Sequence, residues 1–132
     1  MPCKVKITGG KNDISLDQDI RIKVLFDTEE EHVFQKSNSV GATVTISGSV
    51  DDDSKEAVIQ VSRWSRDFTA DGIYRQVELT DAQEGTDTVL RTYIFPQMFI
   101  LSYEEDWGES NAGNFKLVLK QRKNSLQSIE TF

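Results

Sequence analysis

The feature that most constrains the fold is a two-residue alternation of apolar and polar side chains, which recurs along most of the chain. It is cleanest in residues 40–50, where valine, alanine, isoleucine and one glycine hold the even positions and glycine, serine and threonine the odd ones. Because successive side chains of a strand point to opposite faces, this pattern predicts a strand with one covered face and one small, hydroxylated face. Residues 20–26 and 115–121 repeat the alternation and predict two more such strands.

Further segments complete a predicted sheet. The remaining strand candidates are residues 4–8, 73–80, 88–95 and 98–103. The last two have apolar residues at both odd and even positions, which predicts strands covered on both faces. Pro96 and Gln97 separate them, and because proline has no backbone N–H we expect a connection there. Residues 124–132 are expected to form a loose tail.

One segment changes its period. In residues 53–68 the apolar side chains recur at helical spacing, which predicts an amphipathic helix. Asp53 is the predicted N-cap, and Glu56, three residues later, can complete a capping box. The predicted packing stripe of this helix is Val58, Val61, Trp64 and Phe68.

A polar stretch of residues 27–39 joins two of the predicted strands. Hairpin loops usually have about two to five residues, and longer loops are often functional or disordered. Its central residues are Glu29, Glu30, Glu31, His32, Val33, Phe34 and Gln35. The apolar pair Val33-Phe34 is unnecessary in a purely solvated loop, so we expect this segment to make contacts.

The order of these segments predicts a mainly β fold in one domain spanning residues 1–132. It consists of about seven or eight antiparallel strands in a closed or nearly closed barrel or sandwich. One helix cannot cover both sides of a sheet, so the helix is expected to cover one opening or one flank. No internal repeat or low-complexity linker divides the chain.

Charge and composition exclude several classes of function. The formal net charge of −7 disfavours non-specific nucleic-acid binding, which depends on lysine and arginine neutralising phosphates. No apolar run approaches the roughly 18 residues of a membrane span, and the N-terminus has no apolar segment typical of a secretory signal. We therefore expect a protein made in the cytosol, without a membrane partner, that a dedicated machine could export or build into a virion-like particle.

The sequence offers little for catalysis. His32 is the one histidine, and no nucleophile elbow, zinc-protease motif or phosphate loop is present. The acidic run 104–106 is interpreted as a charged strand end. We therefore predict no enzyme activity, no catalytic or metal-binding residues and no cofactor. Two alternatives stay open: a carbohydrate- or ligand-binding β-sandwich using Trp64 and Trp107, and, less favoured, a peptidase using His32 or Glu104.

Residues 90–123 carry a resemblance to a known family. An apolar strand leads into Tyr103-Glu104-Glu105-Asp106-Trp107, a gapped loop follows, and then the alternating strand 115–120. Together with a single helix containing Trp64, this resembles the tube proteins of contractile injection machines: the Hcp-type proteins of type VI secretion and phage tail-tube proteins. A narrower resemblance is to small Firmicutes proteins labelled "membrane-associated protease", although this chain has no protease residues to justify that label.

The resemblance implies a structural subunit that assembles with itself, as a homohexameric ring, into a tube of a contractile injection, type VI secretion-like or phage tail-like system. The polar segment Glu29–Gln35 would then reach a neighbouring subunit or ring, although it is more acidic than expected. The hydroxylated side chains Thr43, Thr45, Ser47 and Ser49 would face water or a lumen. Implied partners are sheath, baseplate or spike proteins and cargo, with no sequence-specific reading of nucleic acid.

Overall fold

The computed structural model describes residues 3–17, 19–28, 40–83, 85–86, 88–109, 113–121 and 129–132. These residues form one eight-stranded antiparallel sheet and the helix α2. The elements in chain order are β1 (Cys3–Thr8), β2 (Ile14–Leu16), β3 (Ile20–Thr28), β4 (Val40–Val50), α2 (Lys55–Trp64), β5 (Arg75–Ala82), β6 (Val89–Asp106), β7 (Gly113–Gln121) and β8 (Glu130–Thr131).

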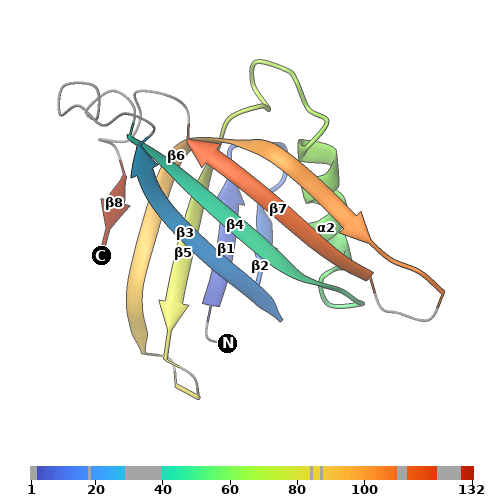
Figure 1. The fold of residues 1–132 in the computed structure, drawn as a ribbon, viewed down its shortest axis with the longest axis horizontal. Coiled ribbons are helices and arrows are strands. Elements are labelled where there is room, and N and C mark those ends of the chain that lie inside the picture. The colour runs from blue at the N-terminus through green and yellow to red at the C-terminus, as the bar shows by residue number, and fades with distance from the viewer. Residues whose placement is uncertain are drawn as a thin grey trace.

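The sheet curls over itself to form two layers. Its strand order is β2-β1-β5-β6-β7-β4-β3, and β8 pairs with β6 outside this path. In Figure 1, β3, β4 and β7 cross in front of β1 and β5, and α2 lies at one side. Among the described residues the two edge strands β2 and β3 do not pair with each other. The prediction of a mainly β, nearly closed antiparallel body with one flanking helix is therefore confirmed, and the sheet is open along one seam.

The core lies between the two layers and follows the alternation in the sequence. In β4, Ala42, Val44 and Ile46 are at most 1% exposed, whereas the threonines and serines between them are half-buried. The buried apolar side chains are Val5, Ile7, Ile14, Leu16, Ala42, Val44, Ile46, Val58, Val61, Trp64, Val77, Leu79, Phe95, Met98, Phe115, Leu117 and Leu119. Burial of this set is the main stabilising contribution to the fold.

The predicted break at Pro96-Gln97 is wrong, because β6 runs through it as one strand of 18 residues. The pairing with β5 shifts between Val77–Phe95 and Arg75–Met98, which is a β-bulge. Gln97 has a φ of 60°, in the left-handed region. A bulge leaves backbone groups out of the ladder, so the missing N–H of proline costs nothing there. The bend lets the first half of β6 pair with β5 and the second half with β7.

The helix is shorter than predicted at both ends. Its N-cap is Ser54 rather than Asp53, and the Asp51 carboxylate accepts hydrogen bonds from the backbone N–H groups of Asp53 and Ser54 at 2.9 and 3.0 Å. No capping box with Glu56 is formed, because the turn before the helix already provides an acceptor. Val58, Val61 and Trp64 are buried, whereas Phe68 lies beyond the helix end and is 81% exposed.

Two short strands were not predicted. β2 has only three residues, too few for a period to appear, yet Ile14 and Leu16 are buried. β8 lies in the expected loose tail and pairs with β6, while Phe132 and Thr92 exchange two backbone hydrogen bonds of 2.8 and 3.0 Å. Both strands depend on partners distant in the sequence.

Arg75 connects the helix to the sheet. Its guanidinium lies 5.0 Å from the centroid of the Trp64 ring, and it donates hydrogen bonds to the Gly72 carbonyl at 3.1 Å and to the Asp67 carboxylate at 3.4 Å. The Trp64 indole N–H in turn donates to the carbonyl of Ile73 at 3.2 Å. Only 9% of the Arg75 side chain is exposed, and burial lowers its pKa while Asp67 opposes that shift. This contact fixes α2 over one end of the sheet body.

Candidate functional site

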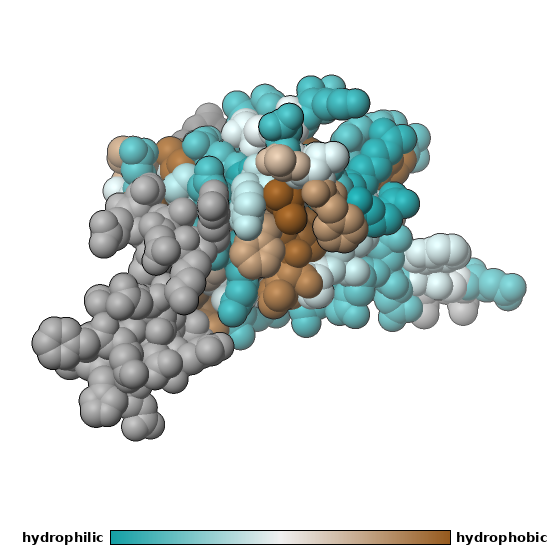
Figure 2. Space-filling view, turned by 90° about the horizontal axis from the view of Figure 1, so that it is seen from above, coloured by the Kyte–Doolittle hydropathy of each residue, from teal (hydrophilic) through white to brown (hydrophobic). Residues whose placement is uncertain are grey.

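Exposed apolar side chains are the first candidate for a functional surface. Seen from above, Figure 2 shows apolar atoms gathered in the middle of one face with hydrophilic residues around them. Over the described residues, the large apolar side chains that stay exposed are Leu25, Phe26, Ile59, Phe68, Val89, Leu90, Leu101, Trp107 and Phe132. Contiguous exposed apolar groups typically mark contact sites with other molecules.

Four of these residues lie at the two ends of β6. The start patch is Leu90 with Phe132, which lies beside it through its pairing with Thr92, while Val89 is exposed on the opposite face of the strand. The end patch is Trp107, which lies just past the end of β6 and is 74% exposed; Leu101, six residues earlier and about 20 Å away along the strand, belongs to neither patch. Figure 1 shows that β6 begins on one side of the molecule and ends on the other, so the two patches lie at opposite ends of this strand. Two different patches on opposite sides are the arrangement that a head-to-tail interface needs.

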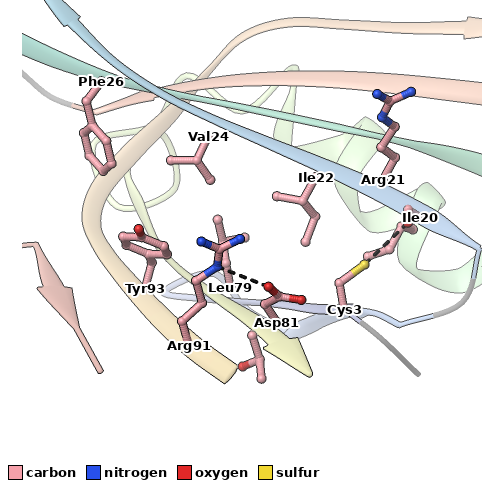
Figure 3. Close-up of a pocket in the computed structure, with 11 residues that line it drawn as sticks. Cys3, Ile20, Arg21, Ile22, Val24, Phe26, Leu79, Asp81, Arg91 and Tyr93 are labelled. Atoms are coloured by element: carbon pink, nitrogen blue, oxygen red, sulfur yellow. Dashed lines mark hydrogen bonds and ion pairs between the residues drawn. The ribbon is translucent and has the colours of Figure 1, made fainter. Parts of the chain in front are cut away.

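The seam of the sheet contains a cavity of about 510 Å³ between β3 and strands β5 and β6. Figure 3 shows Ile22, Val24 and Phe26 of β3 lying across from Leu79 and Tyr93. The Phe26 ring is 6.1 Å from the rings of both Tyr93 and Phe95. Arg91 and Asp81 form an ion pair of 3.1 Å at the rim. The cavity therefore combines apolar side chains with the Arg91–Asp81 pair, and Arg21 and Thr80 also belong to its lining.

Cys3 lies in this cavity but lacks the environment of a nucleophile. Its Sγ is 3.4 Å from the carbonyl oxygen of Ile20. Burial, followed by the nearby Asp81 carboxylate, raises the pKa of the thiol. A reactive cysteine needs the opposite shift, because the thiolate is the attacking species.

The acidic run at the end of β6 forms a charged strand end. Glu104 and Glu105 are exposed, and Glu104 lies opposite Lys116 of β7. The Tyr103 hydroxyl donates a 2.8 Å hydrogen bond to Glu105, and burial together with this carboxylate raises the pKa of Tyr103. In the described part of the chain, no three histidine, cysteine or acidic side chains gather as a metal site would require.

The structure places the predicted site residues in different ways. Glu29, Glu30, Glu31, His32, Val33, Phe34 and Gln35 lie outside the described residues. Thr43, Thr45, Ser47 and Ser49 share the outer face of β4, opposite the buried Val44 and Ile46. Trp64 is 2% exposed and cannot present a sugar platform, so Trp107 alone is left to support the carbohydrate-binding alternative.

The start patch was missed by the sequence reasoning. Residues 88–95 are apolar at both parities and were predicted to be covered on both faces, yet Val89 and Leu90 are exposed. The available signal was the polar segment 83–88 directly before them, which places them next to a turn at the rim of the sheet. An apolar pair at a rim has no second layer to cover it within its own chain.

With this geometry established, comparison with solved structures identifies the fold as that of Hcp-like and tail-tube proteins. A crystal structure of an Hcp protein superposes with a TM-score of 0.58 at 12% identity, covering 100% of this chain and 98% of that one. A chain in the sheath–tube complex of an extracellular contractile injection system, PVC, in its extended state gives 0.58 at 11% identity, covering 97% of this chain and 87% of that one. A chain of the anti-feeding prophage baseplate gives 0.56 at 12% identity, covering 98% and 91%.

The sequence comparisons give no relative. No protein-family model matches the chain, and no curated protein matches it. The narrower resemblance to proteins labelled "membrane-associated protease" therefore has no support. Among the described helical residues, none form a helix of the length and apolarity that a bilayer crossing requires.

Proposed function

We propose that this chain is a structural subunit that assembles with copies of itself into rings, and that the rings stack into the tube of a contractile injection, type VI secretion-like or phage tail-like system. The observation that carries the proposal is the shared fold across nearly the whole of both chains, for an Hcp protein and for a component of a sheath–tube complex. The proposed ring is a hexamer, in keeping with the sixfold symmetry of the baseplate that contains one of the similar chains.

The surface supports this proposal independently of the comparisons. A ring requires that one patch of a subunit binds a different patch of the next. The start and end patches of β6 meet that requirement, since they are both apolar and lie at opposite ends of this strand, on different sides of the body. Within the described residues, one edge of β3 has no strand partner, and it offers a further row of backbone groups for pairing with a neighbour.

The proposed partners are, first, other copies of this chain and, second, sheath, baseplate or spike proteins and cargo. The subunit would be made in the cytosol and then exported or built into a phage-like particle. No catalytic step belongs to the proposal.

The direct test is the oligomeric state of the purified full chain. We expect light scattering after size exclusion to give the mass of a ring, and electron microscopy to show annular particles with sixfold symmetry. A strict monomer at high protein concentration, with no annular particles, would contradict the proposal. Cleavage of casein or model peptides above blank, lost in a Glu104→Gln variant, would favour the peptidase alternative.

A further inference from the structure

The outer face of the front layer has a charge opposite to that of the whole protein. The side chains of β3, β4 and β7 that share a face of the sheet with Thr43 point away from the core. Among them are Arg21, Lys23, Lys116 and Lys120. Figure 3 shows the guanidinium of Arg21 directed away from Ile22 and Val24, although Arg21 is also among the residues that line the cavity. The chain as a whole has 22 acidic and 15 basic residues, so this basic face is a local reversal.

The strand register brings these four cations together on one surface. Ser47 of β4 has Arg21 as its partner on one side and Lys116 on the other. Thr45 lies beside Lys23, and Thr43 lies beside Lys120. Because neighbouring strands are about 4.8 Å apart, the cations of β3 and β7 stand roughly 10 Å from each other across β4. On β4 only short hydroxyl side chains lie between them, while Val118 separates the two lysines of β7 and Leu25 follows Lys23 on β3, so the charged groups rise above short and apolar side chains.

The positive charge of this face exceeds its negative charge. In the three rows of cross-strand partners that run from β3 through β4 and β7 to β6, the acidic residue is Glu104, and Asp106 ends the neighbouring row through Ser49 and Asn114, so four cations stand against two carboxylates. Within the described part of the chain, none of the four cations has a carboxylate within ion-pair distance. Arg21, Lys23 and Lys116 are exposed and Lys120 is half-buried, so their charges are available to a partner.

We propose that this basic face is a docking surface for an acidic protein surface, and that the acidic partner is cargo. Naming the partner as cargo rests on the proposed function, with the basic face lining the channel of the ring. Complementary charge attracts such a partner and suppresses wrong ones, and the hydroxyls of Thr43, Thr45 and Ser47 can hydrogen-bond to its carboxylates. In a ring, the repeated face multiplies weak contacts.

The features of the face favour a protein over a nucleic acid. A nucleic acid extends beyond a small patch and would meet the acidic remainder of the molecule, whereas an acidic protein surface needs to match this face only. Phe99 is the one aromatic side chain in the three rows, and it packs edge-on against Tyr74 at 6.0 Å. A surface that binds single strands typically offers several stacking rings.

The test compares the binding of fluorescent poly-L-glutamate, poly-L-lysine and a single-stranded DNA oligonucleotide to the full chain. We expect poly-L-glutamate to bind and Lys23→Glu with Lys120→Glu to weaken that binding by about tenfold or more. The matched control is Lys4→Glu with Lys6→Glu, which makes the same charge change at exposed positions of β1 in the other layer. This control should stay within about twofold of the parent, since its charges lie outside the face.

A second double variant, Lys23→Gln with Lys120→Gln, removes the two charges without reversing them. It should also weaken the binding of poly-L-glutamate, and it replaces the charge-reversed variant where that variant folds poorly. Equal effects of the face and control pairs, no binding of poly-L-glutamate, or tighter binding of the oligonucleotide would each overturn the proposal. Light scattering on the same samples separates the two proposals. Loss of rings with retained, face-dependent binding contradicts the tube function only, while intact rings without such binding contradict the docking surface only.

Discussion

Arg75 shows how one buried charged side chain can hold two elements together. It combines a cation–π contact with Trp64 and two hydrogen bonds, to the carbonyl of Gly72 and to the half-buried carboxylate of Asp67. A cation–π contact between a desolvated cation and an indole ring stabilises the folded state by about 2 kcal/mol. The pKa of Asp67 is lowered, mainly by its hydrogen bonds from Thr69 and less by Arg75, so Asp67 does not depend on Arg75 to stay ionised.

Replacing Arg75 should therefore loosen the helix without stranding a buried anion. We expect Arg75→Met to lower the free energy of unfolding by about 1–3 kcal/mol, because the cation–π contact and both hydrogen bonds are lost. Urea unfolding followed by tryptophan fluorescence measures this change. Arg21→Met is the matched control at an exposed strand position and should stay within about 0.5 kcal/mol. Equal losses in the two variants would show that the contact contributes nothing.

Tyr103 should make stability sensitive to alkaline pH. Its raised pKa means that the fold favours the neutral phenol. The contribution of the neutral Tyr103 to the free energy of unfolding is complete below the ordinary tyrosine pKa of about 10 and is lost as the pH rises above it. We expect Tyr103→Phe to remove part of the alkaline loss of stability, measured by urea unfolding at a series of pH values. An unchanged alkaline slope in the variant would contradict this assignment.

The long strand β6 is the element that organises the body, because it belongs to both layers. Its bulge at Pro96-Gln97 and its register shift between Ile100 and Ser102 bend it from one layer into the other. This bend requires a left-handed backbone conformation at Gln97, which is unfavourable for a residue with a Cβ.

A pair of substitutions isolates this backbone effect. Gln97→Gly and Gln97→Val both remove the amide side chain, but glycine adopts a positive φ without penalty and a β-branched residue does so poorly. We expect the valine variant to be less stable than the glycine variant by about 1–2 kcal/mol in urea unfolding. Equal stability would mean that the turn at Gln97 relaxes to an ordinary strand conformation.

For the whole molecule, the placement of the two apolar patches decides how copies can associate. A head-to-tail interface uses a different patch on each partner, whereas a twofold interface uses the same patch twice. The start and end patches lie on opposite sides of the body, so they favour closure into a ring over a simple dimer.

This geometry gives a mixing test. Leu90→Asp and Trp107→Asp should each reduce the ring to monomers, because each places a carboxylate in one of the two patches. A mixture of the two variants should form a one-to-one dimer through the remaining intact patches, as measured by light scattering. Phe68→Asp, an exposed apolar position outside both patches, should leave the ring intact. Monomers in the mixture would contradict head-to-tail pairing of these patches.

Much of the fold was predictable because its signals are local. The alternation in residues 40–50 gave β4 with its observed bounds, and the stripe of Val58, Val61 and Trp64 identified the buried face of α2. Phe68 did not follow the stripe, since the helix ends at Trp64. Whether an apolar side chain is buried depends on which element lies opposite it, and that information is not local.

The candidate surfaces were less predictable. Thr43, Thr45 and Ser47 were identified as a polar face from their parity alone, but the cations beside them come from β3 and β7, whose pairing with β4 is non-local. The start and end patches depend likewise on where β6 turns and on what β8 covers.

The sequence alone determined the two-residue period, the single change to helical spacing and the overall negative charge, because each is carried by neighbours along the chain. Only the tertiary structure decided the strand order, the continuous course of β6 through a proline, the grouping of Arg21, Lys23, Lys116 and Lys120, and the seam along the edge of β3. The reason is that pairing in an antiparallel sheet is a choice among distant partners, made by the joint burial of both faces.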